Sequence, residues 1–279
     1  MNSILQKEQA ERFRQFHHQA TPLILPNIWD AASARVIEQA GFKAVATSSS
    51  ALATALGYSD GQQISRDLLS ETLARITRIV ECPVTADIEA GYGNSIEEVL
   101  QTVKAVIEAG GVGLNIEDSQ IQNKHALVDT SYQVELIQAL RELAVSIEIP
   151  FVINARVDVL LRAIGEPENR LEHTIQRANA YLQAGADCIY PIGLLDRETI
   201  SSLVQEINGP INILGGSPQP TLPELGALGV ARVSLASGPM RSVLGHLRLI
   251  AQELLEYGTY TSLGSKALSN LEFGSLFKQ

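Results

Sequence analysis

Short apolar runs alternate with longer amphipathic stretches along most of the chain, and this alternation predicts a repeated strand–helix unit. Each run is nearly all apolar, as expected of parallel strands that are buried on both faces. The eight predicted strands are Leu23–Pro26, Ala44–Thr47, Val84–Asp87, Gly113–Glu117, Phe151–Arg156, Cys188–Pro191, Ile211–Leu214 and Val233–Ala236. This order favours a (β/α)8 TIM barrel over an open doubly wound sheet, because no GxGxxG turn follows the first strand.

The amphipathic stretches have helical spacing, and several end at a glycine suited to a helix C-cap. The predicted helices are Ala31–Ala40, Ser65–Val80, Ser95–Ala109, Tyr132–Ile147, Leu171–Ala184, Arg197–Ile207 and Leu222–Leu228. No linker or change of composition divides the chain, so residues 1–279 are predicted to form a single domain with an extra N-terminal helix.

The region after the eighth strand is longer and more apolar than a free tail. Val243–Leu255 carries an apolar helical stripe that fits two interpretations: the eighth helix of the chain's own barrel, or part of a contact between subunits. Residues 257–279 add further aromatic and leucine side chains. We therefore expect this C-terminal helical extension to lie in an oligomer interface.

Charge and composition limit the classes of partner. The chain has 21 basic and 31 acidic residues and a formal charge of −10, which disfavours binding to nucleic acid or to an anionic membrane. No apolar run reaches the length of a transmembrane helix, and the N-terminus does not resemble a signal peptide. Two cysteines are too few for a disulfide framework. These features predict a cytoplasmic protein, in which any anionic substrate, such as a small-molecule carboxylate, would need a local cation or metal.

Carboxylates gather at the ends of two predicted strands, and a cation follows the next one. Asp87, Glu89 and Glu117 end the third and fourth strands, and Arg156 ends the fifth. In a barrel these ends meet at one mouth. Such acids repel one another unless a cation lies between them, and an all-oxygen set suits Mg²⁺ or Mn²⁺. Ordinary ion pairs at the strand ends are the alternative for any one of these residues.

Four motifs occur at the expected strand ends: GYSDG at Gly57–Gly61, TADIEAGYG at Thr85–Gly93, NIED at Asn115–Asp118 and NARVD at Asn154–Asp158. In this order they resemble the isocitrate lyase/phosphoenolpyruvate mutase superfamily. The resemblance covers nearly the whole barrel and implies a Mg²⁺-dependent enzyme that acts on small 2-oxo or 2-hydroxy acids.

The resemblance also implies roles for individual residues. It implies that Asp87 is the direct Mg²⁺ ligand and that Glu89 and Glu117 hold metal-bound waters. It implies that Asp60 lies near the substrate and that Arg156 binds the substrate's anionic group.

Further residues are expected to surround the substrate. The resemblance implies that backbone amides around Ser48, Ser49 and Ser50 hold the substrate carboxylate. Trp29 and Tyr92 are candidate walls of the pocket, with barrel packing as the alternative interpretation of each.

The loop after the fourth strand departs from both specialised patterns of the superfamily. Its sequence, SQIQNKHALVD from Ser119 to Asp129, lacks the cysteine that supplies a proton in the carbon–carbon lyases. Asn123 and Lys124 resemble the Asn and Lys of phosphonomutases, although Lys124 is one residue out of step. His125 is either a solvated loop residue or a proton shuttle.

The sequence therefore predicts a Mg²⁺-dependent lyase that cleaves a C–C bond or removes CO₂ through an enolpyruvate-like intermediate. Decarboxylation is favoured because it does not need the missing cysteine. A phosphoenolpyruvate/phosphonopyruvate mutase or hydrolase is the first alternative, and a non-catalytic dicarboxylate-binding barrel is the second. The resemblance also implies a homotetramer, built as a dimer of dimers, or at least a dimer.

Overall fold

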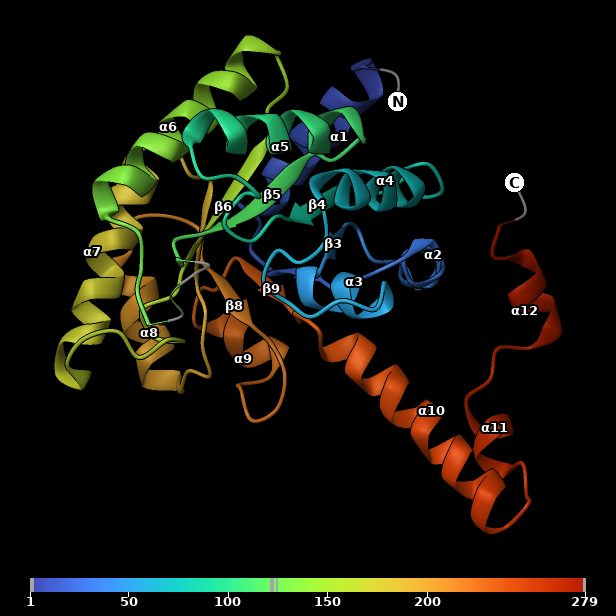
Figure 1. Ribbon diagram of the computed structural model, residues 1–279. Coiled ribbons are helices and arrows are strands. Elements are labelled where there is room, and N and C mark those ends of the chain that lie inside the picture. The colour runs from blue at the N-terminus through green and yellow to red at the C-terminus, as the bar shows by residue number, and fades with distance from the viewer. Residues whose placement is uncertain (1–2, 121–122, 124, 278–279) are drawn as a thin grey trace.

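Parallel strands form a ring and helices cover its outer face, as the alternation of the sequence predicts (Figure 1). The computed structural model describes residues 3–120, 123 and 125–277. Its strands are β1 (Leu23–Leu25), β2 (Asn27–Ile28), β3 (Val45–Thr47), β4 (Val84–Asp87), β5 (Gly113–Glu117), β6 (Val152–Val157), β7 (Cys188–Pro191), β8 (Asn212–Leu214) and β9 (Arg232–Ser234).

The first predicted strand, Leu23–Pro26, contains β1, and a second short strand, β2, lies beyond its predicted end, so the hydrogen-bonded ladder is divided here. Pro26 lies between the two strands and has no N–H to donate, so β1 pairs with β9 while β2 pairs with β3. The other strands follow in the order β3-β4-β5-β6-β7, and β8 pairs with β9. A parallel bridge between Ile189 and Ile211 joins β7 to β8. With β1 and β2 counted as one strand, the ring has eight strands, which is the (β/α)8 barrel.

Most predicted helices are present, with ends within three residues of those expected. They are α2 (Ala31–Gln39), α4 (Arg66–Thr77), α5 (Ile96–Glu108), α6 (Thr130–Ser146), α7 (Arg170–Gln183), α8 (Arg197–Glu206) and α9 (Leu222–Ala227). A 3₁₀ turn, η1, covers Pro167–Asn169.

Two elements at the barrel mouth differ from the expected pattern. A short helix, α3 (Ser49–Ala55), follows β3 and was not among the predicted helices. The Ser48 hydroxyl caps it by accepting a hydrogen bond from Ala51 N. The last strand ends at Ser234 rather than at Ala236, because Ala236 has a left-handed backbone with φ of 47°.

The N-terminal helix α1 (Ser3–Phe16) closes the end of the barrel opposite the strand C-termini. Phe13 is fully buried in the core, and the Gln6 amide donates to the carbonyls of Ile107 and Gly111 at 2.8 and 2.9 Å. Burial lowers the pKa of His17, just after this helix, to about 3, so its imidazole is neutral. This end of the barrel is therefore packed rather than open.

The C-terminal region leaves the barrel. Helix α10 (Gly238–Glu256) projects away from the ring as an arm, followed by α11 (Thr261–Ser265) and α12 (Asn270–Ser275) (Figure 1). Its apolar stripe is uncovered: the exposed fraction is 58% for Leu247 and 88% for Leu255. The stripe thus does not close the chain's own barrel, which removes one of the two sequence interpretations. No helix in the described chain is long and apolar enough to cross a membrane.

Packing inside the barrel leaves no room for a side chain at Gly113 on β5. A Cβ there would lie 2.9 Å from the Val152 carbonyl oxygen and 3.0 Å from the Phe13 ring. We expect Gly113→Ala to lower the free energy of unfolding in urea by about 1–3 kcal/mol, the usual cost of overpacking. Gly264→Ala is the control, since a Cβ at Gly264 meets nothing within 4 Å. Equal stability of the two variants would contradict this account.

Candidate active site

Polar side chains from several strand ends converge on a cavity of about 460 Å³ at the carboxyl end of the barrel. Parallel strands bring their C-termini to one face, so residues far apart in the sequence meet there. The lining residues are Ser49, Asp60, Gly61, Glu89, Glu117, His125, Arg156, Leu161 and Arg162. Three predicted acids and the predicted arginine are thus brought together in one cavity.

Asp87, at the end of β4, is held by the start of α3. Its Oδ2 accepts hydrogen bonds from the Ser49 backbone N at 3.0 Å and from the Ser49 hydroxyl at 2.8 Å. Its own backbone N donates to Thr47 Oγ1 at 2.8 Å. These contacts fix one face of the carboxylate and connect it to the loop predicted to hold substrate.

Glu89 is buried in a strained turn after β4. Both carboxylate oxygens accept from the Gln62 backbone N, at 3.0 and 2.9 Å, and Oε1 also accepts from the Tyr92 hydroxyl at 3.0 Å. Gln62, Glu89 and Tyr92 all have positive φ, between 51° and 57°, an unusual backbone for residues with a Cβ. Burial, and next the charge of Asp87, raise the pKa of Glu89 to about 8.

Glu117, at the end of β5, pairs with Arg156 at the end of β6. Arg156 Nη1 lies 2.6 Å from Glu117 Oε2, and the Ser119 hydroxyl donates to Glu117 Oε1. Burial raises the pKa of Glu117 to about 7, while the charge of Arg156 opposes the rise. The pair keeps both groups at the cavity wall, where Arg156 is 15% exposed.

The donor set fits a hard divalent cation. The acids facing the cavity offer only oxygen, and the charges of Asp87, Asp60 and Glu117 all raise the pKa of Glu89, so the negative charges crowd one another. Within the described part of the chain, no three His, Cys, Asp or Glu side chains are arranged to hold one ion together. Mg²⁺ usually takes few direct protein ligands and keeps several waters, through which the other acids could act.

The loop residues predicted to carry catalysis are only partly placed. His125 lines the cavity but is exposed, and its backbone N donates to Asn123 Oδ1 at 3.1 Å. Asn123 is exposed and is not among the residues that line the cavity. Lys124 lies outside the described residues.

The predicted substrate-binding residues divide into two groups. Ser49 lines the cavity and donates to Asp87. Ser48 instead caps α3, and the Ser50 carbonyl accepts a hydrogen bond from the Thr54 hydroxyl within that helix. Tyr92 contacts Glu89 rather than the cavity itself. Trp29 is half-buried after β2, and its backbone N donates to Ser33 Oγ, also away from the cavity lining.

Neither cysteine replaces the missing loop thiol. Burial raises the pKa of Cys82 and of Cys188 to about 12, so both thiols stay protonated near neutral pH. Cys188 is enclosed within β7.

Sequence reasoning missed two residues of the site. Asp158 stands in the NARVD motif and is fully buried, and it binds both Arg156 and Arg162. Arg162 follows Asp158 by one helical turn, a spacing at which oppositely charged side chains meet. That spacing was the available signal, but it is common on exposed helices and does not by itself indicate a cavity.

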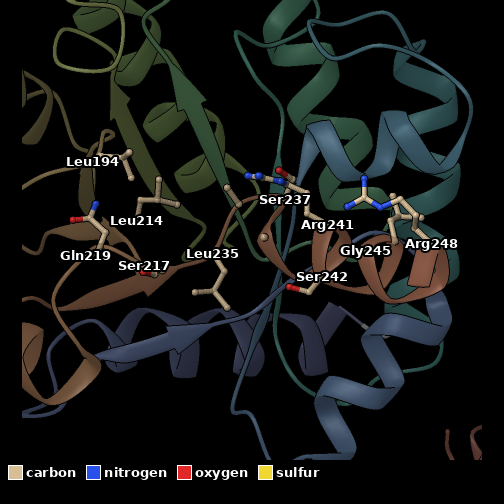
Figure 2. A pocket seen from close by; sticks show the side chains of 15 residues that line it. Leu194, Leu214, Ser217, Gln219, Leu235, Ser237, Arg241, Ser242, Gly245 and Arg248 are labelled. Atoms are coloured by element: carbon tan, nitrogen blue, oxygen red, sulfur yellow. The ribbon is translucent and has the colours of Figure 1, made fainter. Parts of the chain in front are cut away.

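A second and larger hollow of about 750 Å³ lies where the loops after β8 and β9 meet the start of α10 (Figure 2). Among the described residues that line it, the charged ones are Arg241 and Arg248, and none is a carboxylate. We place the chemistry in the smaller cavity, because that one holds the acids able to bind a cation or move a proton.

The chain belongs to the phosphoenolpyruvate phosphomutase family, whose profile matches residues 13–255. It is 30% identical to a 2-methylisocitrate lyase of Halalkalibacterium halodurans, over 74% of this chain and 67% of that protein. It is also 30% identical to an oxaloacetate decarboxylase of Rhodopseudomonas palustris, over 91% of this chain and 81% of that protein. A solved structure from Burkholderia cenocepacia superposes with a TM-score of 0.90 and 33% identity, covering 98% of this chain and 97% of that one. The predicted superfamily and barrel fold are confirmed.

The raised pKa of Glu89 predicts how stability changes with pH in the metal-free protein. Between pH of about 4.5 and about 8 the folded protein keeps a proton that the unfolded chain has released, so the free energy of unfolding falls as pH rises. We expect Glu89→Gln to flatten this fall, measured by urea unfolding with chelator present. Glu71→Gln, an exposed residue paired with Arg75, is the control. A fall as steep in Glu89→Gln as in the unaltered protein would contradict the prediction.

Proposed function

We propose that the protein is a Mg²⁺-dependent lyase that cleaves a C–C bond of a small 2-oxo or 2-hydroxy carboxylate, most simply by releasing CO₂. The observation that carries the proposal is the convergence of Asp60, Glu89, Glu117 and Arg156 on one cavity, with Asp87 beside it. The family's lyases and decarboxylases among the relatives support the same class of reaction.

The residues that would hold the ion are Asp87 directly, with Glu89 and Glu117 acting through water. Mn²⁺ suits the same oxygen ligands. A bound divalent ion supplies a Lewis acid that withdraws electrons from the substrate carbonyl while the bond breaks. Asp87 is already oriented by Ser49, so binding requires little rearrangement of that carboxylate.

The protein's own groups bind the substrate and control protons. Arg156 lies at the cavity wall, where its guanidinium, held by Asp158 and Glu117, offers a positive charge to a substrate carboxylate. In the metal-free protein, burial and the charge of Asp87 raise the pKa of Glu89, and the Tyr92 hydroxyl donates to its carboxylate at 3.0 Å. When CO₂ leaves, the bonding electrons stay on the neighbouring carbon, which takes up a proton afterwards. The departure of CO₂ needs no acid, so this reaction does not require the cysteine that the loop after β5 lacks.

The phosphonomutase or hydrolase reaction is the second candidate. The presence of Arg156 and Arg162 in the cavity lining favours it, because two positive charges suit a phosphonate. ¹H and ³¹P NMR of the protein with Mg²⁺ and a panel of 2-oxo acids, methylisocitrate, phosphoenolpyruvate and phosphonopyruvate separates the candidates. Carboxylate products with silent phosphorus spectra support the lyase. A C–P to O–P rearrangement supports the mutase. No turnover across the panel leaves the dicarboxylate-binding barrel.

The metal assignment predicts a large effect at Asp87. We expect Asp87→Asn to weaken Mg²⁺ binding by about 100-fold or more, measured by calorimetry, because it removes the charge of the one direct ligand. Asp67→Asn, an exposed acid in the first turn of α4, should bind as the unaltered protein does. Unchanged affinity in Asp87→Asn would rule out this ligand, and Glu89→Gln and Glu117→Gln should cost less.

We infer that the chain assembles as a homotetramer, or at least as a dimer, through its C-terminal region. Large apolar side chains on the C-terminal helices are exposed: 58% for Leu247 on α10, and 81% for Leu271 and 70% for Phe273 on α12. This is a large apolar surface for a free chain. A second copy that covers the arm buries this surface and satisfies the closed symmetry usual in oligomers.

Two variants test the assembly by light scattering. Truncation after Glu256 and Leu247→Glu should each shift the mass towards that of one chain, because each removes or charges part of the apolar surface. The truncation also deletes the hydrogen bond from Arg35 to the Leu276 carbonyl, whereas Leu247→Glu keeps it, so the substitution separates the two effects. Val145→Glu, at an exposed apolar position on α6, is the matched control. A monomeric unaltered protein at micromolar concentration would refute the inference.

A further inference from the structure

We propose that Arg177 on α7 is a positioning residue of the active site, which fixes the two ends of the loop after β5 and the backbone of Asp158. The proposal rests on the lyase or mutase function above and adds a residue that acts without touching substrate. Arg177 is buried and is not among the residues that line the cavity. It therefore influences a bound substrate through the residues that it holds.

The loop after β5 begins and ends as a short antiparallel hairpin. The Val128 backbone N donates to the Asp118 carbonyl at 2.8 Å, and Ser119 forms an antiparallel bridge with Leu127. We call these four residues the loop base. The Ser119 hydroxyl donates to Glu117 Oε1, so the loop base is bonded directly to an acid of the cavity. A shift of the loop base would move this donor away from Glu117.

Arg177 ties both strands of the loop base to α7. Its Nη1 donates to Asp118 Oδ2 at 3.0 Å, and its Nη2 donates to the Val128 carbonyl at 2.9 Å. Nη1 also donates to the Tyr181 hydroxyl at 2.8 Å, and Nε donates to His173 Nε2 at 3.0 Å. The Arg177 side chain is 8% exposed, and that of Asp118 is fully buried. All three guanidinium nitrogens thus have acceptors, which a single-nitrogen side chain such as lysine could not reproduce.

Asp118 connects Arg177 to the arginines of the cavity. Its Oδ2 accepts from the Tyr181 hydroxyl at 2.8 Å, and its Oδ1 accepts from the Asp158 backbone N at 2.9 Å. The Asp158 carboxylate in turn accepts from Arg156 Nε at 2.6 Å and from Arg162 Nε at 2.7 Å. A continuous series of contacts therefore runs from α7 to both guanidiniums that line the cavity.

Stability alone does not account for this buried ion pair. A buried Arg–Asp pair loses hydration on both sides, and apolar side chains of similar size often stabilise a fold at least as well. What the pair adds is fixed geometry, because each oxygen of Asp118 bonds a different segment: α7 on one side and the turn after β6 on the other. Asp118 also directly follows Glu117, so the network fixes the backbone next to an acid of the cavity.

Calorimetry with two titrants separates a positioning role from a general loss of structure. We expect Arg177→Gln to weaken binding of oxalate in saturating Mg²⁺ by about 10- to 100-fold, the usual cost of losing a residue that orients a binding group. Binding of Mg²⁺ alone should change by less than about threefold, because the proposed direct ligand, Asp87, is held by Ser49 instead. Arg141→Gln is the matched control: it breaks a part-buried pair with Asp187 at the other end of the barrel and should change neither affinity.

Amide hydrogen exchange tests the same contacts without any ligand. In Arg177→Gln the Val128 and Asp158 amides should exchange about tenfold faster or more, because their acceptors, the carbonyl and the carboxylate of Asp118, are no longer held in place. Arg141→Gln should leave both rates as in the unaltered protein.

Two further variants grade the effect. Arg177→Lys keeps the charge beside Asp118 but cannot reach all the acceptors, so its oxalate affinity should fall between those of Arg177→Gln and the unaltered protein. Tyr181→Phe keeps the ion pair and removes one donor to Asp118, so it should weaken oxalate binding by about 2- to 10-fold. Tyr181→Phe also carries the test if Arg177→Gln does not fold.

Unchanged oxalate binding in Arg177→Gln would overturn the proposal. An equal loss of Mg²⁺ and oxalate affinity would overturn it as well, because it would show a general loss of structure. The proposed function fails separately: if the unaltered protein binds no oxalate with Mg²⁺, the metal-assisted site is refuted, and exchange at Val128 and Asp158 still decides the role of Arg177.

Discussion

The mutual repulsion of buried carboxylates at the barrel mouth is the constraint on which the rest of the site depends. Asp87, Glu89 and Glu117 are brought close by adjacent strands, and each would be unfavourable there without a compensating partner. Three features reduce this repulsion. Backbone N–H groups of Ser49 and Gln62 donate to Asp87 and Glu89, the raised pKa of Glu89 favours its neutral form, and the guanidinium of Arg156 pairs with Glu117. A divalent cation would relieve what remains, so the charge arrangement and the proposed cofactor have one cause.

Much of the fold follows from the sequence because buried parallel strands and surface helices have different hydrophobic periods. The strand ends then place these side chains without further information, which is why Glu89, Glu117 and Arg156 line one cavity. Local backbone effects were harder to foresee. Pro26 separates β1 from β2, Ala236 ends another strand in a left-handed conformation, and the serine run after β3 forms a helix once Ser48 caps it.

Features that depend on a partner surface could not be predicted from periodicity. The apolar stripe on α10 could pack on the barrel of its own chain or on that of another subunit. Only the structure shows that the stripe does not pack on its own barrel and stays exposed. Arg162 is a similar case. Its spacing from Asp158 predicts an ion pair, but whether the pair faces solvent or a cavity depends on the turn after β6. The positions of α10 and of the Asp158–Arg162 pair in the fold cannot be predicted from residue types alone.

The barrel interior links this mouth to the closed end through polar rather than apolar side chains. Asn115 on β5 accepts from Asn154 on β6 at 2.6 Å, and the fully buried Arg232 on β9 donates to the same Asn115 oxygen at 3.2 Å. Asn115 is also paired in register with Asp87. A slip of one residue in β5 would leave Arg232 without this acceptor and move Glu117 off the cavity. The interior amides therefore specify the register that puts the acids and Arg156 on the same face of the barrel.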